Sequence, residues 1–293
     1  MTSLPAWLGD GPADIASLDV SALDAGLRSG WGVFETLRAH GTATLGSERH
    51  VARLIAGADR LAIAVDGDHV REALERTLAA PRDVHEVAVR ITLTAGPVDA
   101  ATWPPAPIGA PTLVVTLHPA PALPCPATRA VTVTATRWPA DLKATSYVAS
   151  ILATRQAQAA GADTAVLCDG DELLETAEGN LLAIIDGALV TPEADGRLLP
   201  GVTRELALEA AGRLGVPVRI GPLRRDDVVR AEAVMVSSAV TGLRTLTQLD
   251  GHVLQGAGPG PGPTSPSADA RTSADALHPV VIALRQALEA LRR

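Results

Sequence analysis

The 293-residue chain is poor in lysine and in aromatic side chains. Lys143 is the one lysine among 25 cationic residues, and all the others are arginine. Aromatic residues make up 2% of the sequence against 47% for hydrophobic residues as a whole, so a core has to be built from Ala, Val and Leu. A chain of this length and hydrophobic content is long enough for one large or two medium domains.

Cysteine is scarce too, and its pattern excludes the common metal-binding scaffolds. Cys125 and Cys168 are isolated, and neither belongs to a CxxC motif or a histidine-rich cluster. Two such thiols are typical of a protein in a reducing compartment. We therefore expect no metal site.

Long apolar runs and basic character are also missing. No run of about 18 apolar residues could span a bilayer, and no N-terminal basic and apolar stretch resembles a signal peptide. The net charge of -8 and the pI near 5.4 argue against nucleic acid or an anionic membrane as a partner. These absences favour a soluble cytoplasmic protein.

The first third of the sequence predicts a sheet with a helix on it. Apolar residues alternate with polar ones in EVAVRITLTAG (86–96) and PTLVVTLH (111–118), which is typical of strands. Apolar residues recur at helical spacing in 48–62, so Arg53 is expected on a helix beside its apolar stripe. The proline-rich stretch 118–130 favours a linker.

The second part of the chain predicts further mixed structure. We expect strands at 130–136 and 233–238, helices at 149–162 and 203–214, and an amphipathic helix at the C-terminus. Asp186-Gly187 between two apolar runs is a strong hairpin signal. Residues 256–277 are of low complexity, which favours a flexible loop.

Lys143 has a chemistry that arginine cannot replace. Arginine does not lose its proton near neutral pH, and only a neutral amine attacks a carbonyl to form a Schiff base. Tyr147, the one tyrosine of the chain, follows four residues later and shares a face with Lys143 if the stretch is helical or extended. The alternatives are an ordinary surface lysine and a tyrosine that packs in the core.

Five segments in a fixed order resemble a known family. They are GWGVFETLRAHGTATLGSERHVARL (30–54), DLKATSY (141–147), LLETAEGNLLAI (173–184), LLPGVTRELAL (198–208) and VSSAVTGLR (236–244). In these segments the chain resembles the class IV aminotransferases, which are pyridoxal phosphate enzymes of fold type IV. The resemblance implies a two-domain α/β (α+β) fold of the D-amino acid aminotransferase type, with domains 1–121 and 122–293. It also implies pyridoxal 5'-phosphate as cofactor, a small-molecule amine as substrate and a homodimer.

The first three motifs supply most of the residues that the resemblance assigns to the cofactor. Arg53 matches the family's phosphate-binding arginine, and a guanidinium can hold a phosphate through two hydrogen bonds. Lys143 matches the lysine that forms the Schiff base and moves the proton. Tyr147 would hydrogen-bond on the side of the ring hydroxyl. Glu175 would face the pyridine nitrogen and keep it protonated.

The last two motifs match phosphate-binding turns of the family. The amides of Val202 and Thr203, with the Thr203 hydroxyl, would meet the phosphate at a helix N-terminus, and Arg204 is expected to point elsewhere. In the final loop many aminotransferases carry threonine where this chain has Ala239. A contact there has to come from the backbone or from Ser238.

Departures from the family pattern bear on which reaction is catalysed. The KATSY spacing and the SSAVTGLR loop resemble the 4-amino-4-deoxychorismate lyase branch, which releases pyruvate and 4-aminobenzoate in folate biosynthesis, and this is the leading hypothesis. The alternative is a class IV aminotransferase for branched-chain or other amino acids, and the third is a non-catalytic member that binds only a cofactor or a partner. The candidate ligands for a substrate carboxylate are Arg28, Arg90, Arg137 and Arg244.

Overall fold

The computed structural model describes residues 4–99, 101–135, 137–256 and 277–291. The chain divides into two compact units, which are described separately. Unit 1 comprises Met1–Pro121 and Leu142–Tyr147, and unit 2 comprises Ala122–Asp141 and Val148–Arg293. The domains expected from the sequence, 1–121 and 122–293, differ in the assignment of the segment Leu142–Tyr147.

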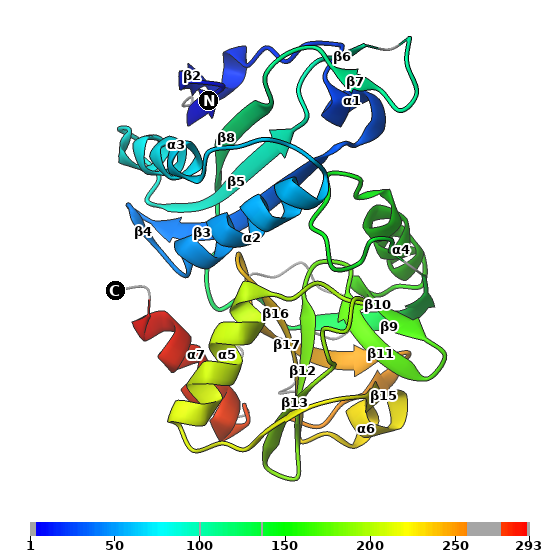
Figure 1. Ribbon diagram of the computed structural model, residues 1–293. Helices are drawn as coiled ribbons and strands as arrows, with labels where there is room; N and C mark the ends of the chain where they lie inside the picture. The colour runs from blue at the N-terminus through cyan, green and yellow to red at the C-terminus, as the bar shows by residue number, and fades with distance from the viewer. Residues whose placement is uncertain (1–3, 100, 136, 257–276, 292–293) are drawn as a thin grey trace. The chain divides into compact units, whose positions relative to one another are not determined.

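Unit 1 is built on a six-stranded antiparallel sheet in the order β2-β1-β8-β5-β3-β4. Its strands are β1 (Pro5–Leu8), β2 (Gly11–Asp14), β3 (Gly32–His40), β4 (Ala43–Thr44), β5 (Glu86–Thr94) and β8 (Thr112–Pro119). Alternate residues of β5 are buried, as the sequence pattern of this stretch predicts. The helices α2 (Ser47–Arg60) and α3 (Gly67–Ala79) pack against this sheet (Figure 1).

The smaller elements of unit 1 lie between these strands. They are the single 3-10 turn Ile15–Ser17, the short helix α1 (Ala25–Ser29), and a two-stranded pair of β6 (Val98–Asp99) and β7 (Ala106–Pro107). The buried face of the sheet and the apolar stripes of α2 and α3 form one core, in which Leu37, Leu54 and Ile91 are at most 1% exposed. This core contains no phenylalanine or tyrosine among its buried members, in keeping with the composition of the chain.

The segment Leu142–Tyr147 belongs to unit 1 because it pairs with an edge of β3. β4 lies on the same edge of β3 but pairs only with the C-terminal end of that strand, at Ala39 and His40. Near the start of the strand the amide of Phe34 therefore donates to the Lys143 carbonyl at 2.9 Å, and the amide of Thr145 donates to the Gly32 carbonyl at 2.9 Å. Through these hydrogen bonds Leu142–Tyr147 groups with unit 1, whereas the sequence places it in the domain 122–293.

Unit 2 contains a ten-stranded mixed sheet. Its strands are β9 (Thr128–Thr134), β10 (Thr164–Asp169), β11 (Glu172–Thr176), β12 (Asn180–Ile185), β13 (Ala188–Thr191), β14 (Val218–Ile220), β15 (Leu223–Arg224), β16 (Ala233–Ser238), β17 (Gly242–Leu249) and β18 (His252–Val253). Because β11 pairs with both β10 and β12, the path β12-β16-β17-β9-β10-β11 closes on itself as a barrel. The β12–β13 hairpin turns at Asp186 and Gly187, both with positive φ, as the Asp-Gly signal predicts.

Four helices accompany this sheet: α4 (Val148–Ala159), α5 (Val202–Arg213), α6 (Arg225–Arg230) and α7 (Pro279–Ala290). The last helix, drawn in red in Figure 1, packs on α5 and on β17. Val281, Leu284 and Leu288 form its buried stripe, whereas Leu291, which the sequence pattern adds to the stripe, follows the helix and is 38% exposed. The interior of the expected flexible loop at 256–277 lies outside the described residues.

No helix in the described part of the chain is both long and apolar enough to cross a bilayer. Within the same residues, no group of three or more His, Cys, Asp or Glu side chains is arranged to hold a metal ion. Cys125 and Cys168 are both buried and unbridged.

Candidate functional site

The site residues expected from the sequence are divided between the two units. Arg53, Lys143 and Tyr147 lie in unit 1, and Glu175, Val202, Thr203, Ser238 and Ala239 lie in unit 2. The surroundings of each group are set within its own unit, so they are given unit by unit.

In unit 1 the single lysine, phenylalanine and tyrosine of the chain meet. Lys143 Nζ lies 4.6 Å from the centroid of the Phe34 ring, and the Arg90 guanidinium carbon lies 3.6 Å from the same centroid. The Tyr147 ring packs edge-on against Phe34, with centroids 5.3 Å apart and an interplanar angle of 81°. A cation over an aromatic face is attracted by the electrons of the ring, so Phe34 holds two cations in one place. Sequence reasoning missed Phe34, although its being the only phenylalanine was a usable signal.

The sheet explains how Arg90 reaches Phe34. Thr36 on β3 is paired with Arg90 on β5, and Phe34 is two residues along β3 on the same face, which makes Phe34 and Arg90 diagonal neighbours. Burial lowers the pKa of Arg90, and the nearby Tyr147 and Glu35 oppose this effect. Arg90 makes no hydrogen bond or ion pair with the described residues. Its guanidinium therefore remains able to accept an anionic ligand.

Arg53 is the second expected residue of unit 1, and it is not an isolated surface cation. It projects from α2 and donates two hydrogen bonds to Glu35 on β3, a carboxylate that is 0% exposed. His50, one turn earlier on α2, also contacts Glu35. The Arg53 side chain itself is 16% exposed. Glu35 and His50 were contained in the GVFET and HVARL motifs but were not recognised as partners of Arg53.

In unit 2 the buried Glu175 carboxylate is held by three neighbours. Arg137 Nη2 donates to Oε1 at 2.7 Å, and the Leu199 amide donates to Oε2 at 3.2 Å. Asn180 Nδ2 donates to the Leu199 carbonyl at 2.7 Å and lies 3.5 Å from Glu175 Oε2. Arg137 and Glu175 thus form an ion pair, and their side chains are 11% and 6% exposed. This pairing, unforeseen from the sequence, occupies Arg137, which was a candidate for binding a substrate carboxylate.

The N-terminus of α5 offers unpaired amides beside this carboxylate. The helix starts at Val202 after Gly201, which has no side-chain cap. The Glu205 amide donates to the Gly201 carbonyl at 3.0 Å, whereas the amides of Val202 and Thr203 make no backbone hydrogen bond with the described residues. A Cβ atom on Gly201 would lie 1.9 Å from Asn180 Oδ1, so only glycine fits between the helix and β12. Thr203 is 5% exposed. Such a helix end attracts anions because its N–H groups and its dipole both point toward them.

Arg204, in the same turn, is hydrogen-bonded to the end of β13 and the residue after it. Its Nε donates to Thr191 Oγ1 at 3.0 Å and its Nη2 donates to the Pro192 carbonyl at 2.8 Å. Burial lowers the pKa of Arg204. Its role is to tie α5 to the end of β13.

The turn after β16 carries the last two expected residues, Ser238 and Ala239. Ser238 Oγ lies 2.7 Å from Thr241 Oγ1 and accepts a hydrogen bond from the Thr241 amide at 3.2 Å. The preceding Ser237 is paired with Asn180 across the sheet. Asn180 therefore contacts or neighbours all three features of unit 2, which are the Glu175 carboxylate, the start of α5 and the turn at Ser238.

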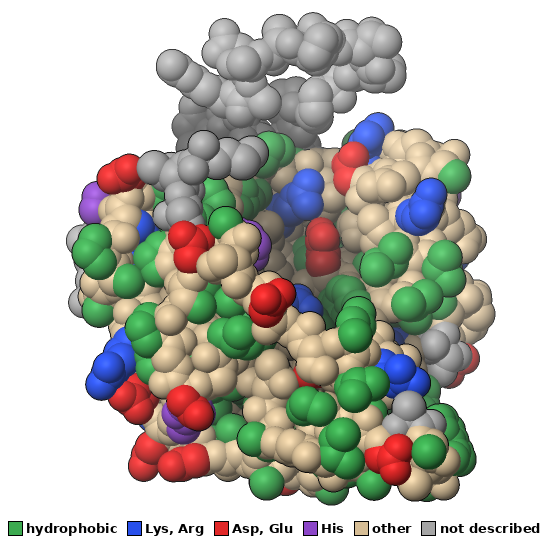
Figure 2. All heavy atoms as spheres, turned by 90° about the horizontal axis from the view of Figure 1, so that it is seen from above, with side chains coloured by type: hydrophobic (Ala, Val, Ile, Leu, Met, Phe, Trp, Pro, Cys, Tyr) green, Lys and Arg blue, Asp and Glu red, His purple; other side chains and the backbone are tan. Residues whose placement is uncertain are grey.

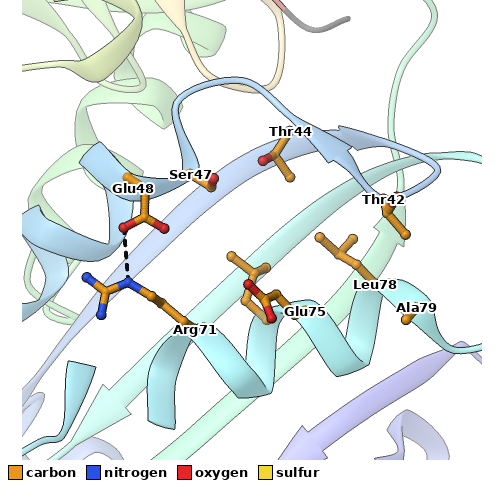
Figure 3. A pocket seen from close by; sticks show the side chains of 9 residues that line it. Thr42, Thr44, Ser47, Glu48, Arg71, Glu75, Leu78 and Ala79 are labelled. Carbon is orange, nitrogen blue, oxygen red and sulfur yellow. Dashed lines mark hydrogen bonds and ion pairs between the residues drawn. The ribbon is translucent and has the colours of Figure 1, made fainter. Parts of the chain in front are cut away.

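A cavity of about 340 Å³ in unit 1 is lined by other residues (Figure 3). It is formed by the β3–β4 hairpin, the start of α2 and α3, and is lined by Thr42, Thr44, Ser47, Glu48, Arg71, Leu74, Glu75, Leu78 and Ala79. Arg71 pairs there with Glu48 at 3.0 Å, and the Glu48 side chain is 71% exposed. None of the expected site residues lines this cavity.

The charges on the surface do not gather by sign on the face that Figure 2 draws. Lys and Arg side chains are interspersed there with Asp and Glu among the described residues. Such an arrangement offers no extended basic surface on this face.

The residues described above lie within a region that matches a known protein family. A family model described as amino-transferase class IV matches residues 32–249, which include every expected site residue. The chain belongs to the class IV aminotransferases. Members of this family are enzymes, so the unit 1 and unit 2 clusters are candidates for parts of its active site.

Two curated relatives of this class IV chain match it over most of their length. The D-alanine aminotransferase of Listeria monocytogenes is 29% identical over 245 residues, which cover 80% of this chain and 83% of the relative. A protein of Methanocaldococcus jannaschii, named provisionally as a branched-chain-amino-acid aminotransferase, is 29% identical over 244 residues, which cover 80% and 84%.

Solved structures of the family share the fold. The fold IV transaminase CpuTA1 of Curtobacterium pusillum has a TM-score of 0.75 and 26% identity, covering 83% of this chain and 88% of that one. A hypothetical aminotransferase of Mycobacterium tuberculosis, solved in its pyridoxal phosphate-bound form, has a TM-score of 0.81 and 22% identity, covering 98% of each chain. The fold is thus the mixed α/β fold type IV, as expected.

Proposed function

We propose that the protein is a pyridoxal phosphate-dependent aminotransferase that acts on amino acids. The observation that carries this proposal is the meeting of Lys143 with Arg90 at the Phe34 ring. It puts an amine beside a guanidinium that has no hydrogen-bond or ion-pair partner among the described residues. The curated relatives reported above are named as aminotransferases of D-alanine and of branched-chain amino acids. Transamination is therefore favoured over the lyase reaction that the loop sequences suggested.

The donor groups present fit the parts of this cofactor. The α5 amides of Val202 and Thr203, with the Thr203 hydroxyl and the Ser238 turn, suit a phosphate. Arg53 would add a guanidinium to the same phosphate. The carboxylate of Glu175, which is buried and paired with Arg137, suits a protonated pyridine nitrogen.

Three further expected residues are Ala239, Tyr147 and Lys143. Ala239 has no polar side chain, so it would contribute its backbone amide. Tyr147 packs against Phe34 and would direct its hydroxyl to the ring hydroxyl side of the cofactor. Lys143 would hold the cofactor covalently through its amine.

When bound, pyridoxal phosphate withdraws electrons from the bonds at the substrate Cα atom. Lys143 would act as the base that removes the proton from the substrate Cα atom. It would then act as the acid that returns the proton to a different carbon atom. Glu175 would place its carboxylate at the pyridine nitrogen. In the overall reaction a donor amino acid and an acceptor keto acid would exchange the amino group and the carbonyl oxygen, so the donor becomes a keto acid and the acceptor an amino acid.

Arg90 is the residue we propose for the substrate carboxylate. Of the four candidates, Arg137 is paired with Glu175, and Arg244 donates to the Pro126 carbonyl at 2.7 Å and lies 3.5 Å from Glu178. Arg28 is exposed on α1. Arg90 is partly buried, is without an acceptor among the described residues and shares the Phe34 ring with Lys143.

The decisive experiment separates the transaminase from the lyase. The purified protein with pyridoxal phosphate is given single D- or L-amino acids without an acceptor, and the keto acid and the cofactor spectrum are followed. A stoichiometric keto acid with a changed spectrum supports the transaminase. Release of pyruvate and 4-aminobenzoate from aminodeoxychorismate without an acceptor, with no amino acid reacting, would instead establish the lyase. Inactivity in both assays, with an absorbance spectrum that Lys143→Ala leaves unchanged, would mean a non-catalytic member.

We also propose that the enzyme is a homodimer, as the family resemblance implies. Val148, Ile151 and Leu152 lie on one face of α4 and are 64%, 53% and 60% exposed. Large apolar side chains that cluster on a surface helix are typical of interfaces. Light scattering after gel filtration should give twice the chain mass, and Ile151→Glu should reduce it.

A further inference from the structure

Glu35 is a carboxylate buried on the helix-covered face of the unit 1 sheet. Side chains alternate along β3, so Glu35 shares the face of Leu37, whereas Phe34 points to the opposite face. α2 packs on β3. His50 and Arg53 are three residues apart on this helix, and both therefore face Glu35.

Both carboxylate oxygens of Glu35 are engaged. Arg53 Nε donates to Oε1 at 2.6 Å and Arg53 Nη2 donates to Oε2 at 2.9 Å. His50 Nδ1 lies 2.7 Å from Oε2 and has to be the donor, because an ionised carboxylate only accepts. The two bonds from Arg53 form a fork that fixes the plane and the direction of its guanidinium.

The three side chains form a charged group in an apolar core. Burial by itself raises the pKa of Glu35, but the hydrogen bonds and charges of His50 and Arg53 outweigh it and bring this pKa to about 2. His50 is 1% exposed, and its Nε2 has no hydrogen-bond partner among the described residues. A buried ion pair is seldom more stabilising than apolar side chains of equal volume. A functional advantage, rather than a gain in stability, would explain why these three buried side chains are charged.

We propose that Glu35 is a positioning residue that holds the Arg53 guanidinium in the orientation in which it binds the cofactor phosphate. His50 fixes the carboxylate from the other side. This inference rests on the phosphate-binding role proposed above for Arg53. An arginine without such a carboxylate partner samples many rotamers and loses more conformational entropy when it binds a ligand. Glu35 therefore raises the affinity for the phosphate although it does not contact the phosphate itself.

The test compares two ligands that differ only in the phosphate. Protein freed of cofactor is titrated with pyridoxal phosphate and with pyridoxal, and the ratio of the two dissociation constants measures what the phosphate contributes. Glu35→Gln keeps the side-chain volume but cannot accept the full fork, so it should weaken pyridoxal phosphate binding about tenfold and leave pyridoxal binding unchanged. A purely structural role of Glu35 would change both ligands together.

Three further variants sharpen the result. In an Arg53→Met background, Glu35→Gln should no longer change the ratio, because the residue through which it acts is missing. Glu86→Gln is the matched control, since it removes a carboxylate that accepts from Arg38 Nε at 2.7 Å in the same unit, and it should leave the ratio unchanged. If Glu35→Gln does not fold, Glu35→Asp keeps the charge but is too short for the fork and should also lower the phosphate contribution.

The outcomes separate this inference from the proposed function. If Arg53→Met lowers the phosphate contribution and neither Glu35 variant does, the positioning role is wrong and the role of Arg53 stands. If Arg53→Met itself leaves the ratio unchanged, Arg53 does not bind the phosphate. The proposed role of Arg53 and the positioning role of Glu35 are then both wrong. Loss of pyridoxal and pyridoxal phosphate binding in parallel in the Glu35 variants would also overturn the positioning role.

Discussion

The stability of unit 1 should depend on pH through Glu35. Its pKa in the folded protein is about 2, against 4.5 as its ordinary value, so the folded state favours the ionised carboxylate. The difference corresponds to about 3 kcal/mol of stability at pH 7, because one pKa unit is worth about 1.4 kcal/mol. Since the folded pKa is depressed, this contribution is complete above pH 4.5 and is lost as the pH falls toward 2. At pH 3.5 about 2 kcal/mol should remain.

The perturbation that isolates this effect is Glu35→Gln. Urea unfolding of wild type and variant is followed by tryptophan fluorescence at pH 7 and at pH 3.5. Trp7 is 2% exposed and Trp31 packs against the same core, so their emission should change when unit 1 unfolds, whereas Trp103 and Trp138 are both 89% exposed. The free energies of unfolding of the two proteins should differ by about 1 kcal/mol less at pH 3.5 than at pH 7.

The control for this experiment is an ion pair at the surface of the same unit. Glu72 pairs with Arg76 on α3 at 2.9 Å, and the two side chains are 48% and 66% exposed. Glu72→Gln should change stability by at most about 1 kcal/mol, with no comparable pH dependence. An equal difference between wild type and Glu35→Gln at both pH values would mean that Glu35 titrates normally in the folded protein and that the expected pH dependence is wrong.

Other perturbations should act as follows. Lys143→Ala should abolish the cofactor absorbance that borohydride bleaches while near-ultraviolet circular dichroism stays the same, and Lys143→Arg should not restore it, because arginine keeps its proton. Gly201→Ala places a Cβ atom 1.9 Å from Asn180 Oδ1 and should weaken pyridoxal phosphate binding at least about tenfold in a titration, because the α5 amides have to shift. Wild-type affinity in this variant would mean that the helix end does not bind the phosphate. Leu284→Ala, at a position that is 0% exposed on α7, should cost about 2–5 kcal/mol in urea unfolding. Leu291→Ala should cost much less, and equal costs would contradict the packing of α7 described above.

Much of the local structure was predictable from the sequence. The alternation of apolar residues predicted the strand β5, and their helical spacing predicted the helix α2. Both patterns are informative because each element buries one apolar face. Asp186-Gly187 gave a hairpin because both residues of this turn take positive φ, which Gly and Asp tolerate best. The family motifs named the candidate site residues because their spacing along the chain can be read without knowing the fold.

Pairings between distant segments were not predictable in the same way. The segment around Lys143 joins unit 1 through hydrogen bonds to β3, more than a hundred residues earlier in the sequence. Arg137 was a candidate for a substrate carboxylate until its pairing with Glu175 became visible. No local pattern carries such information, because the partner of a side chain depends on strand order and register.

The family, the local elements and the candidacy of Lys143 as the Schiff-base residue follow from the sequence alone. Only the tertiary structure decided what surrounds that residue and what holds the expected phosphate ligand. Phe34 and Glu35 are adjacent in the sequence, yet one meets Lys143 and Arg90, and the other meets His50 and Arg53. The reason is that neighbouring side chains on a strand point to opposite faces, and the packing of the whole unit sets what each face meets.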